Sequence, residues 1–563
     1  MTPPPTDQNT VERADRYGRF GLAFLAMYGM LVVVPWILLV LRASSVSGWM
    51  VVVALVLTTG VVALLPSPVD RAREVALGMV LVAGALLFAG IIAHNVYDGS
   101  WDGRTYHADA IIALEDGWNP YEDPQPAGFG YGNTVRSFPK ASWLAAATIY
   151  DLTGSVETGK AVDVLPLGGS FLLILGLLTR LGVERRVAWA GAALAAANPI
   201  WVVQSLSNYV DGQSAALTLA AIAAGMWIVL VERTRPASWS LAVSLLLLIN
   251  LKFSGIFYAG LILLALTIVL VGQRRWGELR RFFVTQGVVV VLAVAAIGFN
   301  PYVQNLLDFD HPLHPVAGAD RIDFFTPNSP VNLRDASQVS QLAYGVFGKP
   351  NNDVQEPAAL TVPFNPANLT SATPYSGSDT RIAGLGPLFS GALLVAIALW
   401  AWLLTRERGR SRREVLVVGL LGAFLLLSWA LHAEGWWARY TPQLWLVPIA
   451  VAIVAATRAD RMARGLGAGL AAILVLNLLF VTGAHYRARI LHTGDVSAIY
   501  ETFGDEPILV SLPRFHAATR VQIAEAGLSM EEFPSPAELP CATPEELPAQ
   551  AGFYCPAGWS AGG

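Results

Sequence analysis

Long apolar blocks constrain this chain more than any other feature of its sequence. They run for about 17–22 residues with few charges, the length that an α-helix needs to cross ~30 Å of hydrocarbon. Of the 563 residues, 54% are hydrophobic and 14% are charged, whereas a soluble domain would carry about a quarter charged residues. The sequence therefore predicts an α-helical polytopic membrane protein.

The apolar blocks divide into thirteen expected membrane spans. They cover residues 20–41, 49–65, 75–93, 162–179, 187–205, 212–231, 237–250, 254–271, 283–299, 384–404, 415–431, 442–457 and 466–484. The blocks at 237–250 and 254–271 could instead form one long helix broken near Lys252, which would reverse the topology beyond it. With residues 1–19 in the cytoplasm, thirteen spans place every short arginine-rich loop, such as 406–413, on the inner side. The single-helix alternative breaks this pattern, so thirteen spans are preferred.

Three long segments then fall on the side opposite the cytoplasmic N-terminus, residues 1–19. They are the outer loop 94–161, the outer loop 300–383 and the tail 485–563. The loop 300–383 is rich in Pro and Asn and has little apolar periodicity. We therefore expect a transmembrane domain over residues 20–484, with large extracytoplasmic loops and a separate C-terminal domain.

The tail, residues 485–563, has the pattern of a small α/β domain. Residues 507–512 are typical of a strand and residues 517–527 of a helix. The two cysteines of the chain, Cys541 and Cys555, both lie here. They suffice for one disulfide if the tail faces an oxidising compartment.

The first outer loop opens with residues 95–121, which concentrate carboxylates, a histidine and aromatic residues just outside the expected bilayer boundary. Polar groups at such a place are usually kept for function, because burial there costs them hydration. Asp102 precedes an expected helix, 103–116, whose apolar spacing suits a helix lying along the membrane surface. Asp102 could cap this helix or face a cavity as a general base, and the two roles are compatible. Asp98 is the second candidate for the base.

Short motifs recur along the chain on the same expected side of the membrane. They are Asp102-Gly-Arg-Thr-Tyr106 with Gly117-Trp-Asn-Pro-Tyr121, Phe138-Pro139, Asn300-Pro-Tyr302 leading to His311-Pro-Leu-His-Pro315, and Arg439-Tyr440-Thr-Pro442. In this order the chain resembles the GT-C class of integral membrane glycosyltransferases, which includes the protein O-mannosyltransferases and the aminoarabinose and arabinofuranosyl transferases. The mannosyltransferases carry Asp-Glu where this chain has Asp102-Gly103.

The resemblance implies transfer of a sugar from a polyprenyl-phosphate donor to a glycan, lipid or protein acceptor on the outer face of the membrane. A carboxylate would deprotonate the acceptor hydroxyl, and the lipid phosphate would leave the anomeric carbon with inversion. The departing phosphate needs cations to stabilise it. Arg439 is the first candidate, because a guanidinium binds phosphate oxygens in bidentate fashion. Ordinary snorkelling at a helix end is its alternative role.

Further candidates for substrate binding lie in the outer loops or at the outer ends of spans. They are Tyr106, His107, Arg136, Lys140, Asp211, Lys252, His311, His314, Glu434 and Tyr440. Plainer alternatives are solvation for Arg136 and Lys140 and helix capping for Asp211. His311 and His314 could bind a divalent metal with nearby aspartates, or they could form local hydrogen bonds or contact the sugar.

Other functions are less well supported by the sequence. A polymerase or ligase of lipid-linked glycans shares the donor chemistry, but would use cations rather than a first-loop aspartate. A flippase or transporter should show paired halves with helices broken at matching positions, and neither is visible. There is no Walker A, Gly-x-Ser-x-Gly or zincin motif, and a net charge of −4 indicates no nucleic-acid partner. The Ala, Arg and Gly bias is typical of a GC-rich bacterial genome, so we expect a bacterial cell membrane.

Overall fold

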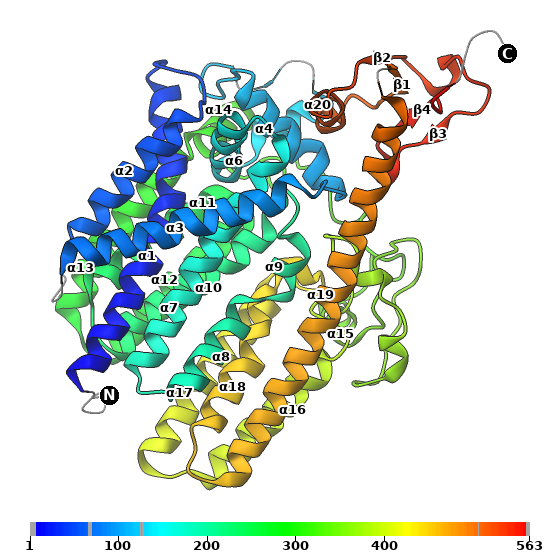
Figure 1. The fold of residues 1–563 in the computed structure, drawn as a ribbon. Coiled ribbons are helices and arrows are strands. Elements are labelled where there is room, and N and C mark those ends of the chain that lie inside the picture. Colours follow the sequence, from blue (N-terminus) through cyan, green and yellow to red (C-terminus); the bar gives the residue numbers. More distant parts are fainter. Residues whose placement is uncertain (1–6, 66–69, 124, 127–128, 505, 559–563) are drawn as a thin grey trace.

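The computed structural model describes residues 7–65, 70–123, 125–126, 129–504 and 506–558. Most helices lie side by side in one bundle, with the C-terminal strands at one end and the N-terminus at the other (Figure 1). Within these described residues, nine helices are long and apolar enough to cross a membrane, and three shorter apolar helices accompany them. The chain is therefore a helical membrane protein.

The long apolar helices form most of the bundle. They are α1 (Gln8–Val40), α3 (Arg71–His94), η2 with α7 (Val156–Asp163 and Val164–Arg180), α10 (Asp211–Leu230), α12 (Phe253–Gly272), α13 with η3 (Trp276–Val291 and Leu292–Ile297), α16 (Phe389–Arg406), α17 (Gly409–Leu431) and α19 (Arg461–Phe503). The shorter apolar helices are α2 (Trp49–Ala63), α11 (Arg235–Leu251) and η8 with α18 (Pro442–Trp445 and Leu446–Ala456).

Short helices and strands make up the rest of the described structure. The helices are η1 (Gly103–His107), α4 (Ala108–Glu115), α5 (Gly132–Ser137), α6 (Ala141–Thr153), α8 (Arg185–Ala196), α9 (Pro199–Gln204), η4 (Phe299–Val303), α14 (Gln304–Phe309), α15 (Gln338–Phe347), η5 (Pro366–Leu369), η6 (Thr373–Tyr375), η7 (Ala438–Tyr440), α20 (Ala517–Glu525), η9 (Pro536–Glu538) and η10 (Pro548–Gln550). The strands are β1 (Ile508–Ser511), β2 (Met530–Glu532), β3 (Glu545–Glu546) and β4 (Phe553–Tyr554).

Each expected span overlaps a helix, but the prediction of one helix over 187–205 is wrong. The structure has two helices there, α8 and α9, because Pro199 disfavours a helical conformation at Asn198. The Asn198 side chain instead accepts a hydrogen bond from the N–H of Ile200 at 2.9 Å and caps α9. The helices α11 and α12 are separate and pack against each other, and Lys252 between them is extended. The count of thirteen crossings stays a prediction.

Glycines let the helices α1 and α7 approach each other closely. A Cβ on Gly169 of α7 would lie 2.8 Å from Leu25 Cγ of α1, and a Cβ on Gly21 would lie 3.0 Å from Leu173 Cγ. Such contacts are typical of helices packed inside a membrane, where close van der Waals packing stabilises the pair. The α1–α7 pair therefore provides a tightly packed centre for the bundle.

The last helix, α19, continues far beyond the expected end of its span at residue 484. The apolar run ends there, but no proline interrupts residues 485–503, and the helix ends only at Gly504, whose φ is +52°. Its final turns pack Val496, Tyr500 and Phe503 into the core of the C-terminal domain. This helix therefore connects the membrane bundle directly to the tail.

The C-terminal domain has a four-stranded sheet in the order β2-β1-β4-β3. The strand β1 pairs in parallel with β2 and antiparallel with β4, and β3 pairs antiparallel with β4. Cys541 and Cys555 form a disulfide beside this sheet. The helix α20, which follows β1 in the chain, packs against η1 and α4 of the first long loop. The tail and this loop therefore share one end of the bundle (Figure 1).

The helix expected along the membrane surface after Asp102 is instead enclosed by other helices. Residues 108–114 of α4 are all buried, because α6 packs on one side and α20 covers the other. Asp109 is fully buried and accepts a long hydrogen bond, 3.3 Å, from the N–H of Ala517. Burial raises the pKa of Asp109 to about 7, and the Ala517 hydrogen bond opposes this only in part.

Candidate active site

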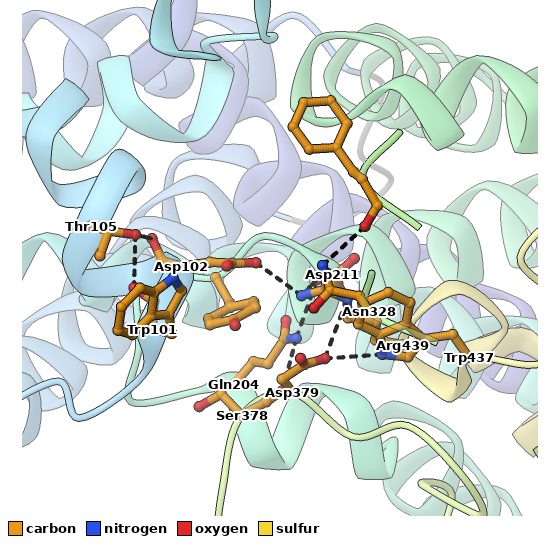
Figure 2. A network of polar contacts seen from close by, with 12 residues as sticks. Trp101, Asp102, Thr105, Gln204, Asp211, Asn328, Ser378, Asp379, Trp437 and Arg439 are labelled. Carbon is orange, nitrogen blue, oxygen red and sulfur yellow. Dashed lines mark hydrogen bonds and ion pairs between the residues drawn. The ribbon is translucent and has the colours of Figure 1, made fainter. Parts of the chain in front are cut away.

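Three carboxylates and two cations from separate parts of the chain meet in one network of ion pairs. We call this group the charged cluster. Its members are Asp102 before η1, Asp211 at the first residue of α10, Lys252 between α11 and α12, Asp379 after η6, and Arg439 in η7. Figure 2 shows four of them, Asp102, Asp211, Asp379 and Arg439. The cluster therefore depends on tertiary packing rather than on any single loop.

Arg439 is the centre of the charged cluster. Its Nη1 lies 3.0 Å from Asp102 Oδ2 and 4.0 Å from Asp211 Oδ2, and its Nε lies 3.5 Å from Asp379 Oδ1. The guanidinium lies over the Trp437 ring, 4.3 Å from its centroid. Burial opposes the charge, but Asp379 and the other carboxylates outweigh it and hold the pKa of Arg439 well above its usual value. Arg439 is thus a permanent, buried cation and does not extend to solvent by snorkelling.

Asp102 is the least constrained carboxylate of the charged cluster. Its side chain is 22% exposed, and among the described residues only Arg439 donates to it. The capping alternative does not hold, because no backbone N–H of η1 bonds to this carboxylate. In this turn the Thr105 hydroxyl donates instead to the carbonyl of Trp101, at 2.9 Å (Figure 2). Asp102 therefore keeps oxygen lone pairs open for a substrate.

Asp211 and Lys252 form the second ion pair of the charged cluster. Gln204 also donates to Asp211, with Nε2 3.2 Å from Oδ2. Asp211 is therefore bound by side chains rather than acting as a helix cap. The Lys252 Nζ lies 3.9 Å from the centroid of the Tyr440 ring, and Arg439 lies 5.3 Å from the same ring. Both cations of the cluster thus contact the Tyr440 ring.

Asp98 lies only one turn away from Asp102, but its contacts indicate a structural role. It is 1% exposed, and its two oxygens accept backbone N–H groups from Ser100 at 2.8 Å and Asn208 at 2.9 Å. A Cβ on Gly103 would lie 2.4 Å from Asp98 Oδ2. The glycine after Asp102 is therefore required by the packing of Asp98, and Asp98 is poorly placed to act as a base.

Tyr106 and His107 lie beside the charged cluster and are buried or nearly so. Their rings are 4.2 Å apart, and His107 Nδ1 accepts a hydrogen bond from Trp143 Nε1 at 2.7 Å. Burial lowers the pKa of His107 to about 3, so its imidazole is neutral and carries its proton on Nε2. Tyr209 connects this pair to the cluster, with its ring centroid 6.2 Å from His107 and 5.5 Å from the Arg439 guanidinium.

Lys140 lies outside the charged cluster. It connects the short motifs that resemble those of the GT-C class. Its Nζ donates to Asn300 Oδ1 at 2.5 Å and to the Phe138 carbonyl at 2.8 Å. Asn300 Nδ2 in turn donates to the Pro120 carbonyl at 2.8 Å. Burial lowers the pKa of Lys140 well below its usual value. Two motifs of the first long loop and the distant motif at Asn300 therefore meet at a structural junction.

Other predicted site residues have local partners of their own. Arg136 pairs with Asp308, His311 Nδ1 accepts the Leu313 N–H at 3.1 Å, and the His314 ring stacks on Phe309. Among the described residues, no hydrogen bond or ion pair joins these side chains to the charged cluster. Across the described ranges, no group of three or more His, Cys, Asp or Glu side chains is arranged to hold a metal ion.

Glu434 likewise has a local partner. Its Oε2 accepts a hydrogen bond from Trp436 Nε1 at 2.9 Å. Burial raises the pKa of Glu434 despite this bond. Glu434 therefore orients Trp436, which stacks on Trp437 with ring centroids 5.2 Å apart. Trp437 in turn contacts Arg439, so the two tryptophans connect Glu434 to the cluster.

The sequence analysis did not identify Asp379 and Arg381. Arg381 Nη2 lies 2.8 Å from Asp379 Oδ2, and the Trp437 indole N–H donates to Asp379 Oδ1 at 2.9 Å. Their only sequence signal is an Asp-Thr-Arg step in a Pro- and Asn-rich loop without periodicity.

Arg489 was missed for another reason, because the last membrane span was expected to end at residue 484, before it. This side chain is 7% exposed, and its Nε and Nη1 have no hydrogen-bond partner among the described residues.

No protein-family model matches this sequence, and no curated protein matches it significantly. The function is therefore argued from the geometry and chemistry of the charged cluster.

Proposed function

We propose that the protein is a GT-C-like glycosyltransferase that uses a polyprenyl-phosphate sugar, with Asp102 as the general base and Arg439 as the phosphate anchor. The observation that carries the proposal is the ion pair between Asp102 Oδ2 and Arg439 Nη1, 3.0 Å apart across a sequence separation of 337. Inverting transfer requires a base and a phosphate-binding cation close together, and this pair supplies both.

The donor phosphate would take the place of Asp102 on Arg439. Guanidinium groups bind phosphate oxygens in bidentate fashion, and Lys252, which also contacts the Tyr440 ring, is a second cation. As the bond between the anomeric carbon and the phosphate oxygen breaks, the electron pair stays on polyprenyl phosphate. Cations already fixed in a site of low dielectric stabilise this developing charge without reorganising.

Asp102 would then act on the acceptor. Once Arg439 binds phosphate, the carboxylate is released from its partner and can accept the proton of an acceptor hydroxyl. The hydroxyl oxygen forms the new bond to the anomeric carbon on the face opposite the departing phosphate, so the configuration inverts. Asp102 ends the step protonated and later loses this proton to water.

Aromatic side chains and the bundle supply the remaining requirements of such a site. Trp437, Tyr209 and Tyr440 all lie within 5.5 Å of the Arg439 guanidinium and offer apolar faces to a sugar ring. The cluster lies at the ends of apolar helices, where a lipid phosphate can enter while its polyprenyl chain stays in the bilayer.

Two features support an extracytoplasmic position for the site. The disulfide between Cys541 and Cys555 is in the tail, which packs against η1 at the same end as the cluster, and disulfides persist in oxidising compartments. The arginine-rich segment 406–413 runs from the end of α16 into the first turns of α17, whose far end leads to Arg439, and such segments favour the cytoplasm. We therefore place the reaction on the extracytoplasmic face of the cell membrane.

The test measures release of polyprenyl phosphate by the purified, reconstituted protein. It uses a panel of radiolabelled polyprenyl-phosphate hexoses and pentoses with envelope extracts as the acceptor source. Asp102→Asn should abolish release while donor binding persists. The matched control is Asp116→Asn, an exposed carboxylate that follows α4, and it should keep wild-type activity.

Each contrary outcome points to a different account. A fully active Asp102→Asn variant beside an inactive Asp98→Asn variant would move the base by one turn. An active Asp102→Asn variant beside an inactive Arg439→Gln variant would favour a cation-dependent polymerase or ligase of lipid-linked glycans. Movement of intact lipid-linked glycan across vesicles without bond cleavage would indicate a flippase.

A further inference from the structure

A cavity of about 770 Å³ lies at the opposite end of the bundle from the charged cluster. The helices α7 and α10 form one wall, and α17 and α18 form the other. The walls are mainly aliphatic and include Ile174, Leu178, Ile222, Met226, Leu421 and Ile449. An apolar chamber of this kind does not hold ordered water well, so its surface favours an apolar occupant.

The depth of the cavity matches one leaflet of a bilayer. Along α10 its lining runs from Leu219 to Leu230, which at about 1.5 Å per residue corresponds to ~17 Å. Half of a hydrocarbon core of ~30 Å is ~15 Å. The lining on α17 covers a similar length, from Arg410 to Leu421. The cavity therefore ends near the middle of the bundle and does not reach Asp211, where α10 begins.

The mouth of the cavity is charged. Three arginines and three acids line it: Arg410, Arg413, Arg458, Glu407, Glu414 and Asp460. Glu414 is shared between two arginines, with Arg458 Nη2 at 2.6 Å and Arg410 Nε at 3.4 Å. Asp460 accepts the backbone N–H of Met462 at 3.1 Å and caps α19.

The charges that line the mouth balance, but the segment that adjoins it is strongly cationic. Within the part of the chain that the structure describes, Arg413 has no hydrogen-bond or ion-pair partner. The adjoining segment 406–413 contains five arginines and one acid, Glu407. Arg408, Arg410, Arg412 and Arg413 are all exposed, but Arg408 and Arg412 do not line the cavity. A bound anion would supply the missing counter-charge beside the first turn of α17, where the helix dipole also favours negative charge.

We propose that this cavity binds one anionic phospholipid, with its acyl chains between the α7–α10 and α17–α18 walls and its phosphate at Arg410 and Arg413. An apolar chamber one leaflet deep fits acyl chains, and an arginine-rich mouth fits a negatively charged headgroup. The occupant belongs to the leaflet opposite the charged cluster, so it is distinct from the glycosyl donor. This inference does not depend on the proposed function.

The test measures which lipid the purified protein retains. The full chain is reconstituted in vesicles with equal amounts of phosphatidylglycerol and phosphatidylcholine that carry the same acyl chains. After extraction in mild detergent, mass spectrometry counts the lipids retained per protein. The wild type should retain about one phosphatidylglycerol, and added phosphatidylglycerol should raise its melting temperature more than phosphatidylcholine does.

Two variants and one matched control complete the experiment. Arg410→Gln/Arg413→Gln should reduce phosphatidylglycerol retention at least tenfold. Arg408→Gln/Arg412→Gln removes the same charge from the same segment but not from the lining, and should retain lipid like the wild type. Ala450→Phe fills the cavity without changing charge and should also expel the lipid, with folding checked by size-exclusion chromatography.

The outcomes that would overturn the proposal are equally specific. Equal retention of phosphatidylglycerol and phosphatidylcholine would remove the assignment of an anionic occupant. Equal loss of lipid in the lining and non-lining arginine variants would assign binding to the general charge of the segment. No lipid retained by the wild type would leave the cavity without this ligand. None of these readouts depends on sugar transfer, so they are separate from the test of the charged cluster.

Discussion

Two groups of buried charges lie on either side of the turn from Asp98 to Asp102, and the protein satisfies them to very different degrees. We call the first the anchoring cluster; it consists of Asp98, Glu157, Lys160 and Gln522. Glu157 pairs with Lys160, accepts Gln522 Nε2 at 2.5 Å and accepts the N–H of Asp98 at 3.2 Å. Every member of this group is bound by another part of the protein.

The charged cluster is left partly open instead. Arg439 faces carboxylates at 3.0, 3.5 and 4.0 Å, and the Asp102 side chain is 22% exposed with a single partner. A saturated group fixes the tail and the first loop to the bundle, because each broken contact would leave a buried polar atom unpaired. An unsaturated group can exchange a protein partner for a substrate. The comparison teaches that hydrogen-bond saturation, rather than residue type, separates the structural Asp98 from Asp102, the proposed base.

The largest expected effect is on turnover in the charged cluster. Asp102→Asn keeps the shape of the side chain but cannot accept the acceptor proton, so the rate of polyprenyl phosphate release should fall by about 10²–10⁴-fold. The melting temperature should change little, because Asp102 is partly exposed. Wild-type turnover, or a loss of turnover caused only by unfolding, would break the distinction between the two clusters.

The anchoring cluster should show the reverse pattern. Lys160→Met leaves Glu157 buried without its cation, which should lower the free energy of unfolding by about 3–5 kcal/mol. Turnover per folded molecule should stay close to wild type. Chemical unfolding of the reconstituted protein measures the first quantity and donor turnover the second. The double variant Glu157→Gln/Lys160→Met should recover part of the loss, and no recovery would indicate that the pair is not coupled.

Asp109, which the tail covers, should make the stability of the folded protein depend on pH. Its folded pKa of about 7 is above the ordinary value of ~3.9, so the folded state prefers the neutral acid. The resulting stability is fully present below about pH 4 and is lost as pH rises through about 7, for a total on the order of 2–4 kcal/mol. Asp109→Asn should remove this dependence and be more stable than wild type at pH 8. Melting temperatures from pH 5 to pH 8 test this, and parallel curves would contradict it.

The smallest effect is expected at Arg136, a predicted substrate residue that lies outside both clusters. Its ion pair with Asp308 has side-chain exposures of 25% and 27%, and pairs of this kind contribute about 0–1 kcal/mol. Arg136→Gln should therefore change neither the melting temperature nor the donor KM by much. A large rise in KM would show that the donor reaches this loop and that the site is wider than the charged cluster.

The sequence predicted the helical membrane class and several members of the cluster for physical reasons. The length and composition of an apolar block indicate directly that it spans a membrane. A carboxylate or guanidinium at the end of such a block is uncommon enough to be a candidate for function. Asp102, Asp211, Lys252 and Arg439 were found in this way. What the sequence could not show is pairing, since the partners of Arg439 come from three distant segments.

The failures have physical causes as well. Asp379 lies in a loop without periodicity, so nothing in its local pattern indicates the contact with Arg439 and Trp437. The helix expected along the membrane surface over 103–116 is buried over residues 108–114, because α20, more than 400 positions later in the chain, packs on it. Asp98 and Asp102 are chemically identical in sequence, and only the N–H groups of Ser100 and Asn208 distinguish them.

The most direct measurement of the central claim is the affinity of unglycosylated polyprenyl phosphate for three forms of the protein. Because Asp102 and phosphate compete for Arg439, Asp102→Asn should bind polyprenyl phosphate about tenfold more tightly than wild type, a gain of ~1.4 kcal/mol. Arg439→Gln should bind it at least tenfold more weakly. Equal affinity in all three forms would show that no phosphate enters the Asp102–Arg439 pair, and would contradict the account.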